Sequence, residues 1–261
     1  MNGGVKIREL REIDEFKEVY RLFDDIWHPA PNNPPVTMEL MIGFAHTGNY
    51  VAGAYDEGGT LVGASVGFRA AERTLHSHVT GAVIGKGIGH ALKAHQREWC
   101  LGQGLERITW TFDPLVRRNA RFNLVKLGAM PEEYLEDFYG KMADAINEGD
   151  ASDRLLAVWR LTDTAKPGEH PRRNAEALLS DEGGWPVAKE ARGGTVLVGT
   201  PADVERLRRE DPAAAAAWRL AVRDTLGRLM KEGRRVVGFT DRGEYVVTQV
   251  NQAFHQSFRS L

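Results

Sequence analysis

Hydrophobic and polar positions in the first part of the chain follow two different periods. Residues 6–11 predict a short strand, and from Ile13 to Trp27 the apolar positions recur at helical spacing. The proline-rich stretch 28–35 ends this helix, because proline cannot continue a helix and restricts the residue before it. A second, shorter helix is expected to begin at Thr37.

Three strand signals follow closely, at residues 50–55, 60–68 and 74–83. In the second of them, apolar residues alternate with small or polar ones, as in a half-buried strand. The glycine-rich connection DEGGT between the first two predicts a tight hairpin turn. The pattern therefore predicts an antiparallel meander, followed by the glycine turn IGKGIG and a helix that extends to about Gly102.

A further strand is predicted at 106–112, where every second residue is apolar. A strand that is reached through a helix usually runs parallel to the strand before it. Residues 117–128 predict another helix with Gly128 as its left-handed end, and two last strands are expected around 132–140 and at 154–161. The expected fold class is α/β, with a mixed sheet of antiparallel first strands and a central parallel pair.

The composition and periodicity of the sequence change after Leu161. Residues 162–174 contain two prolines and no periodicity, which indicates a linker or a surface loop. The elements predicted beyond it are a strand at 195–199, a helix capped by Thr200, a longer helix from Pro212 to before Gly233 and a hairpin at 234–250. We therefore expect two domains, residues 1–163 and a small α+β extension of residues 164–261.

Composition limits the classes of function. The 261 residues carry a formal net charge of −2, which argues against nucleic acid as the main partner. A single cysteine, Cys100, excludes an internal disulfide framework and a multi-cysteine metal site, and no metal is expected. No apolar run approaches the ~20 residues that span a bilayer. The charged N-terminus does not resemble a secretory signal, so we expect a cytoplasmic protein without a membrane partner.

The glycine turn between the third strand of the meander and its helix is a candidate phosphate site. Backbone N–H groups at the start of a helix, with glycines that allow close approach, bind phosphates. The spacing fits neither a P-loop nor a dinucleotide fingerprint, because Gly87 follows Lys86 and His90 follows Gly89. A glycine turn without a ligand is the alternative.

The order of these elements resembles that of the GNAT acyl-CoA transferases over about Val5–Leu161. More narrowly, the segments GKGIGHALKAHQREW, ITWTFDPLVRRNARFNLVKLGA, YLEDFYG and SDRLLAVWRL are similar to a bacterial subgroup with a C-terminal extension. Members of that subgroup are linked with N-acylamino acid racemases, and some transfer succinyl from succinyl-CoA to amino acids.

This resemblance implies an acyl-CoA N-acyltransferase that uses acetyl-CoA or succinyl-CoA and acts on the amine of an amino acid or a similar small molecule. A homodimer is also expected. Coenzyme A is expected to contact Val83, Ile84, Gly85, Lys86, Gly87, Ile88, Gly89, His90 and Asn119. For Asn119, capping or polar packing is an equal alternative to a contact with the pantetheine arm.

The sequence departs from the superfamily pattern at two positions. Ile84 stands where an arginine or glutamine is usual, three residues before the first glycine of the GxG turn. Leu124 stands where many members have the tyrosine that protonates the leaving thiolate.

Two histidines of the predicted strand at 74–83 are candidates for proton transfer and substrate binding. His76 and His78 share one face of that strand with Thr80. An imidazole with an ordinary pKa of about 6.5 accepts a proton near neutral pH. We expect His78 to be the catalytic base and His76 to contact substrate; hydrogen bonds across the sheet are the alternative for both. His95 lies on the apolar face of its helix and is expected in the core.

The remaining candidates follow the predicted strand at 106–112. Asp113 is a candidate catalytic group or, before Pro114, a turn former. Tyr134 and Tyr139 are candidate acids, with Tyr139 preferred, or else aromatic core. Arg154 is a candidate for binding a substrate carboxylate, or forms an edge-strand ion pair. Three arginines either meet the 3′-phosphate of coenzyme A or form a solvated helix face: Arg117, Arg118 and Arg121.

Three functions are compatible with the sequence. The first is N-acylation of an amino acid or similar small amine. The second is a non-catalytic acyl-CoA-binding or regulatory protein, which the residues Ile84 and Leu124 keep open. The third is an aminoglycoside- or protein-modifying acetyltransferase, which should have an acidic substrate cleft.

Overall fold

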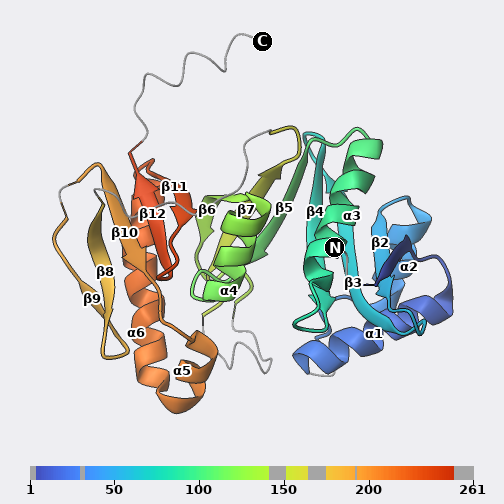
Figure 1. The fold of residues 1–261 in the computed structure, drawn as a ribbon, viewed down its shortest axis with the longest axis horizontal. Helices are drawn as coiled ribbons and strands as arrows, with labels where there is room; N and C mark the ends of the chain where they lie inside the picture. The colour runs from blue at the N-terminus through green and yellow to red at the C-terminus, as the bar shows by residue number, and fades with distance from the viewer. Residues whose placement is uncertain (1–3, 30–32, 141–150, 164–174, 192, 250–261) are drawn as a thin grey trace, which may run out of the picture. The chain divides into compact units, whose positions relative to one another are not determined.

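The computed structural model describes residues 4–29, 33–140, 151–163, 175–191 and 193–249 (Figure 1). The chain forms two compact units that divide within a strand, between Trp110 and Thr111. Residues 160–163 return to the first unit. The domain boundary expected at 163/164 is a different division of the chain and stays a prediction.

The elements of the first unit, in chain order, are β1 (Lys6–Glu9), α1 (Ile13–Trp27), α2 (Met38–His46), β2 (Tyr50–Tyr55), β3 (Leu61–Ala70), β4 (Thr74–Ala82), α3 (Ile88–Gly102) and β5 (Arg107–Phe112), whose last two residues belong to the second unit. Strands β1 to β4 pair antiparallel in sequence order, and β4 pairs parallel with β5. The mixed α/β class, with an antiparallel meander and a parallel pair, is confirmed.

The two faces of this sheet have different helical covers. Apolar side chains of α1 and α2, such as Phe16, Phe23 and Met41, pack on Val51 and Val66 of the strands. The other face carries α3, whose Ile88 and Leu92 pack on Ala54 of β2 and Val62 of β3. Figure 1 shows α3 lying along β4. Successive residues of β3 and β4 therefore point alternately toward α1 and α2 or toward α3.

Local sequence explains where these helices begin. The Thr37 hydroxyl accepts a hydrogen bond from the Leu40 N–H at 3.3 Å and caps α2, as its position before the helix predicts. Helix α1 begins with a capping box formed by Glu12 and Glu15 and ends at His28 in a left-handed conformation. The predicted bounds of α1 and the predicted start of α2 are confirmed to within a residue.

The second unit begins at the end of β5. Its elements are α4 (Arg117–Ala120), the π-helical segment η1 (Arg121–Leu127), β6 (Met130–Leu135), β7 (Arg154–Arg160), β8 (Glu176–Glu182), β9 (Trp185–Ala188), β10 (Thr195–Gly199), α5 (Val204–Glu210), α6 (Pro212–Val222), the π-helical segment η2 (Arg223–Gly227), α7 (Arg228–Lys231), β11 (Arg235–Phe239) and β12 (Glu244–Thr248). Gly128 ends η1 with φ of 76°, as predicted. Strand β6 covers 130–135, so the expectation of a strand around 132–140 was placed too late.

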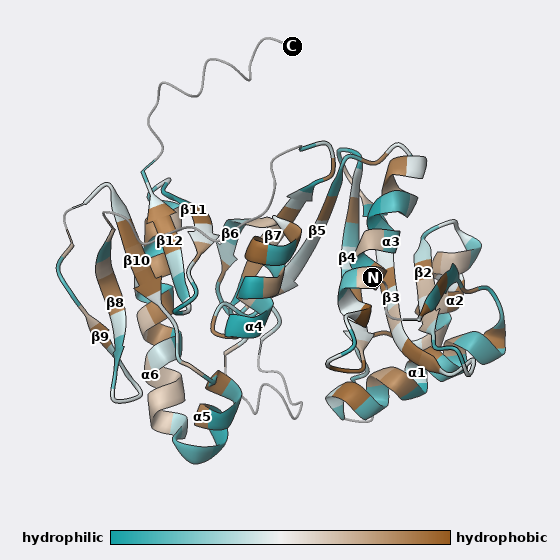
Figure 2. Ribbon diagram, in the orientation of Figure 1, coloured by the Kyte–Doolittle hydropathy of each residue, from teal (hydrophilic) through white to brown (hydrophobic). Residues whose placement is uncertain are grey.

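Two hydrogen-bonded sheets result. The strand order of the first is β1-β2-β3-β4-β5-β7-β6, and that of the second is β11-β12-β10-β8-β9. In the second sheet β10 pairs parallel with β8 and antiparallel with β12. Strand β10 is hydrophobic along most of its length in Figure 2 and has four buried residues.

The sequence predicted the extension only in part. Strands β8 and β9 were not predicted, and of their described residues only Leu179 is buried. Helix α5 is capped by Asp203, whose carboxylate accepts from the Arg206 N–H at 2.9 Å, and the expected cap at Thr200 is wrong. Thr200 is instead buried and donates its hydroxyl to the Gly243 carbonyl. Residues 164–174 of the predicted linker lie outside the described residues.

Candidate active site

Strands β4 and β5 pair over a short stretch and then separate. Their register contains three residue pairs and ends at His76 with Thr109. Strand β4 continues to Ala82 without a further β5 pair in the described register, while its other edge stays paired with β3. Unpaired backbone N–H and C=O groups need other hydrogen-bond partners. The unpaired edge of β4 is therefore able to bind an extended ligand.

Strand β4 carries a bulge at the beginning of this unpaired stretch. The β3 partners pass from Val66 with Val79 to Gly67 with Ser77, so His78 is an extra residue. A bulge disrupts the ladder locally and redirects a side chain. The sequence did not predict this bulge, because the alternation of residues in the segment gives no signal for it.

The rings of His76 and His78 both contact Phe68 of β3, with centroid distances of 5.2 and 6.1 Å. His76 is half-buried and its Nδ1 lies 3.1 Å from the Thr109 hydroxyl, while burial lowers its pKa. His78 is exposed, and its Nε2 donates to the Pro35 carbonyl at 3.0 Å. In the neutral ring Nδ1 of His78 is then the proton acceptor.

The α3 side of β4 carries a buried polar cluster. Lys93 is 4% exposed; its Nζ donates to the Ser77 hydroxyl at 2.9 Å and to Gln96 Oε1 at 3.3 Å. The Gln96 amide donates to the Ser65 hydroxyl. The Lys93 ammonium lies 3.9 Å from the centre of the Trp110 ring, and burial lowers its pKa to about 7. Sequence analysis missed Lys93 and Gln96, because both are polar.

The glycine turn follows β4 directly. Gly85 and Gly87 have φ of 93° and 70°, and a Cβ on either, or on Gly89, would meet nothing within 4 Å. Gly87 caps α3 without a side-chain hydrogen bond. The turn is exposed, and Ile84 is 91% exposed. Open backbone N–H groups at the start of a 15-residue helix suit a phosphate.

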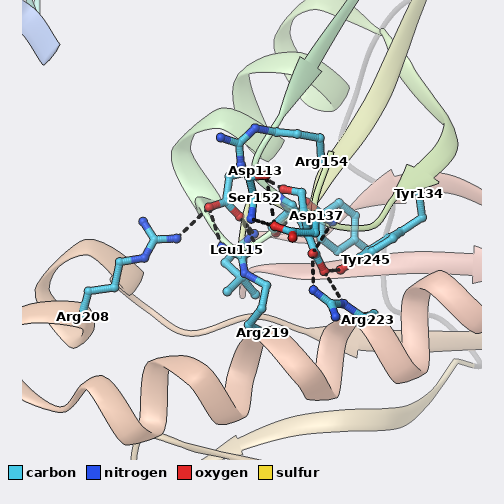
Figure 3. A network of polar contacts seen from close by, with 12 residues as sticks. Asp113, Leu115, Tyr134, Asp137, Ser152, Arg154, Arg208, Arg219, Arg223 and Tyr245 are labelled. Carbon is cyan, nitrogen blue, oxygen red and sulfur yellow. Dashed lines mark hydrogen bonds and ion pairs between the residues drawn. The ribbon is translucent and has the colours of Figure 1, made fainter. Parts of the chain in front are cut away.

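Asp113, in the second unit, is buried among arginines (Figure 3). Its carboxylate accepts from Arg219 at 2.9 and 2.8 Å, from Arg208 at 2.7 Å and from the Leu115 N–H at 2.9 Å. Burial raises the pKa of Asp113, but the Arg219 and Arg208 guanidiniums lower it more, and the net pKa lies well below the ordinary range. These contacts favour a structural carboxylate over a proton acceptor.

A second carboxylate of this unit, Asp153, organises the start of β7. It accepts from the Tyr134 hydroxyl at 2.7 Å and from Arg223 at 2.9 Å. Tyr134 is buried in the core, which was one of the two predictions for it, and burial raises the pKa of its hydroxyl. Arg219 and Asp113 are 106 positions apart along the chain, and Arg223 and Asp153 are 70 positions apart. Sequence periodicity gives no signal for pairs at such separations.

Tyr139 and Arg154 lie close to one another. The Arg154 guanidinium is 5.5 Å from the Tyr139 ring centre and donates to the Asp153 carbonyl. Tyr139 is 46% exposed, and its hydroxyl lies 3.0 Å from that of Thr111. Strand β7 lies between β5 and β6, so Arg154 is not on an edge strand as its alternative reading assumed.

The remaining residues that the sequence singled out differ in burial and in hydrogen bonding. Arg117 donates to the Thr200 hydroxyl at 3.1 Å, and Arg118 pairs with Glu205. Asn119 is half-buried, and Leu124 is fully buried. His95, in the first unit, is half-buried and bonds the Tyr50 hydroxyl at 2.8 Å.

No group of three or more His, Cys, Asp or Glu side chains among the described residues is arranged to hold a metal ion. None of the helices that the structure describes has the length and apolar character needed to cross a bilayer.

No family model matches the chain, and no curated protein matches it. Similar solved structures include Ard1 from Thermoplasma volcanium, at 17% identity and a TM-score of 0.48, over 61% of this chain and 99% of that one. The ribosomal-protein-S18-alanine N-acetyltransferase from Escherichia coli is 11% identical, with a TM-score of 0.47, over 62% and 96%. The structure of yncA from Salmonella typhimurium with its cofactor acetyl-CoA is 14% identical, with a TM-score of 0.48, over 63% and 98%.

Proposed function

We propose that this chain is an acyl-CoA-dependent N-acyltransferase that transfers acetyl or succinyl to the amine of an amino acid or a similar small molecule. One observation carries the proposal. Strand β4 stops pairing with β5 after His76, and its unpaired stretch leads directly into an open glycine turn at the start of α3. A strand edge followed by a helix N-terminus suits a ligand with an extended amide arm and phosphates.

In this proposal the phosphates of the donor bind the turn from Val83 to His90, where Gly85, Gly87 and Gly89 leave room for close approach. The amides of the pantetheine arm hydrogen-bond the unpaired backbone of β4. Asn119 is the proposed side-chain contact to that arm. Ile84 points its exposed side chain to solvent at the position where the superfamily has a polar residue, so the backbone supplies the phosphate contacts.

The reaction requires attack of a neutral amine on the thioester carbonyl. We assign the oxyanion to the backbone N–H groups at the β4 bulge, because a bulge frees them from the ladder. Nδ1 of His78 accepts the proton of the amine, while its Nε2 stays fixed on the Pro35 carbonyl. His76 is the proposed contact to the acceptor.

Two further assignments come from the sequence and concern residues of the second unit. Tyr139, exposed and bonded to Thr111, is the proposed acid for the leaving thiolate, since Leu124 offers no proton. Arg154 is the proposed partner of an acceptor carboxylate. Asp113, which sequence analysis placed among catalytic groups, is better assigned to holding the end of β5 through Arg208 and Arg219.

A non-catalytic acyl-CoA-binding protein is the second candidate, favoured by the buried Leu124 where a tyrosine is usual. The two candidates differ in turnover. The test combines calorimetry of coenzyme A binding with thiol release from acetyl-CoA and succinyl-CoA, against a panel of L- and D-amino acids. Amine-dependent release supports the enzyme, binding without release supports the sensor, and absence of binding refutes both.

Three finer assignments belong to the same proposal. Membership of the racemase-linked subgroup predicts turnover with succinyl-CoA. A homodimer is expected, and sedimentation equilibrium of the full chain measures it. A cytoplasmic location is expected and is tested by fractionation of the source cells.

A further inference from the structure

Lys93 is a buried amine that pairs with no carboxylate of the described residues. Its partners among the described residues are the Ser77 hydroxyl, the Gln96 amide oxygen and the face of Trp110. All three are neutral groups. A buried ammonium without a counter-charge is costly, and such a lysine is readily held as the neutral amine. A neutral, desolvated amine is a nucleophile.

The position of Lys93 matters more than its charge state. Ser77 and Trp110 are the first residues after the last β4–β5 pair, His76 with Thr109. The amine nitrogen therefore lies where the two strands begin to separate. Ser77 is adjacent to the bulge residue His78, at which the proposed function places the thioester oxygen. The acyl carbon would then lie one residue along β4 from the hydroxyl that Lys93 contacts at 2.9 Å.

We propose that Lys93 is a self-acylation site, which takes the acyl group from acyl-CoA bound along β4 when no acceptor amine is present. This inference rests on the proposed function, because it needs the donor at that place. Access to Lys93 from solvent is closed, since 4% of the residue is exposed. Only a donor held along the strand reaches the amine, so the reaction is selective for Lys93 and saturable.

The step balances without a further reactant. The lone pair of Nζ attacks the thioester carbon, the C–N bond forms and the C–S bond breaks. The thiolate leaves with one amine proton, giving free coenzyme A and an amide on Lys93. The product is uncharged, so acylation removes a buried titratable group and fills the position of the acyl tail. An acylated chain is therefore expected to turn over more slowly.

Among the residues that the structure describes, the titratable groups that face Lys93 are Cys100 on α3 and His76 on β4. Burial lowers the pKa of Lys93 to about 7, and the electrostatic interaction with Cys100 opposes this shift only in part. Burial raises the pKa of the Cys100 thiol to about 12, so it stays neutral and does not compete for the acyl group near neutral pH. Acylation should accordingly accelerate between pH 6 and pH 8 and then level off.

The test uses the full chain with acetyl-CoA and no amine, followed by intact mass measurement and peptide mapping. We expect one acetyl group per chain, on Lys93, at a rate that saturates with acetyl-CoA and falls when desulfo-coenzyme A is added. The variants Lys93→Arg and Lys93→Met should lose this adduct. Lys17→Arg, at an exposed lysine of α1, is the matched control and should keep it.

Any of three other results would overturn the inference that Lys93 is a self-acylation site. Acetyl groups scattered over exposed lysines, at a rate linear in acetyl-CoA and indifferent to desulfo-coenzyme A, would mean chemical acetylation only. Binding of desulfo-coenzyme A and amine-dependent thiol release, with Lys93 unmodified, would refute self-acylation and leave the proposed function standing. Absence of coenzyme A binding would refute both. The wild-type measurement decides these outcomes even where a variant fails to fold.

Discussion

Replacing Asp113 by Asn removes the negative charge that two buried arginines share. The side chains of Asp113, Arg208 and Arg219 are 8%, 3% and 2% exposed, and the carboxylate accepts hydrogen bonds from both guanidiniums and from the Leu115 N–H. Removing one partner of a buried ion pair typically costs about 3–5 kcal/mol. With a urea m-value of roughly 2 kcal/mol/M, the unfolding midpoint should fall by about 2 M.

The loss should be confined to the second unit. Hydrogen exchange followed by mass spectrometry should show faster exchange over residues 111–140 and 195–249, with residues 4–29 and 50–82 unchanged. Asp241→Asn, an exposed aspartate in the turn between β11 and β12, is the matched control. Because the folded-state pKa of Asp113 lies below its ordinary value, its stabilisation is present above pH ~4 and is lost as the pH falls through the folded-state pKa. Wild type and variant should therefore converge in acid.

A different result would contradict this account of Asp113. A loss below about 1 kcal/mol, the range of exposed ion pairs, would mean that the carboxylate does not hold the arginines in solution. If the variant were also as stable as wild type but inactive, Asp113 would return to the catalytic role that sequence analysis gave it.

Three further predictions concern the first unit. Gly87→Asp should weaken coenzyme A binding at least tenfold, about 1.4 kcal/mol, relative to Gly87→Ala, which shares its strain at φ of 70°; equal calorimetric affinities would refute the phosphate assignment. His78→Ala should lower thiol release by about 10²–10⁴-fold with unchanged coenzyme A affinity, while His46→Ala on α2 should not; an unchanged pH profile would return His78 to structure. Gly81→Val should lower the free energy of unfolding, measured by thermal melting, by about 1–3 kcal/mol, because a Cβ there lies 2.5 Å from the Trp27 ring. Gly43→Ala, in open space on α2, should be neutral or stabilising in the same melt.

The first unit was largely predictable because its elements carry strong periodic patterns. Helix α1 and strand β2 have the predicted bounds, and the glycine-rich turn DEGGT between β2 and β3 predicts their antiparallel pairing. The inward face of α3 was predicted less well. The apolar pattern selected His95 and Trp99, which are half-buried, whereas the structure buries Lys93 and Gln96. Hydrophobicity cannot mark a polar residue that is buried because it has polar partners elsewhere in the chain.

The second unit was harder to predict for a different reason. Strand β8 has one buried residue, Leu179, and a charged end, so its sequence lacks the alternation of a half-buried strand. Its parallel pairing with β10 is a long-range contact that no local pattern marks. Asp113 was identified as a candidate, but its role depends on arginines 95 and 106 positions further along the chain.

Because Asp113 and its two arginine partners lie 95 and 106 positions apart, the C-terminal extension cannot be freely replaced by that of another protein. A fragment ending at residue 163 would keep the carboxylate of Asp113 and lose both of its guanidinium partners, so the part of the second unit that it contains would lose this support. Grafting the extension of another protein onto this chain would succeed only where the incoming helices bring arginines at the places of Arg208 and Arg219. Because Asp113 pairs with both arginines, a change at one of the three positions leaves a buried charge without its partner. We therefore expect Asp113, Arg208 and Arg219 to be gained and lost together during evolution.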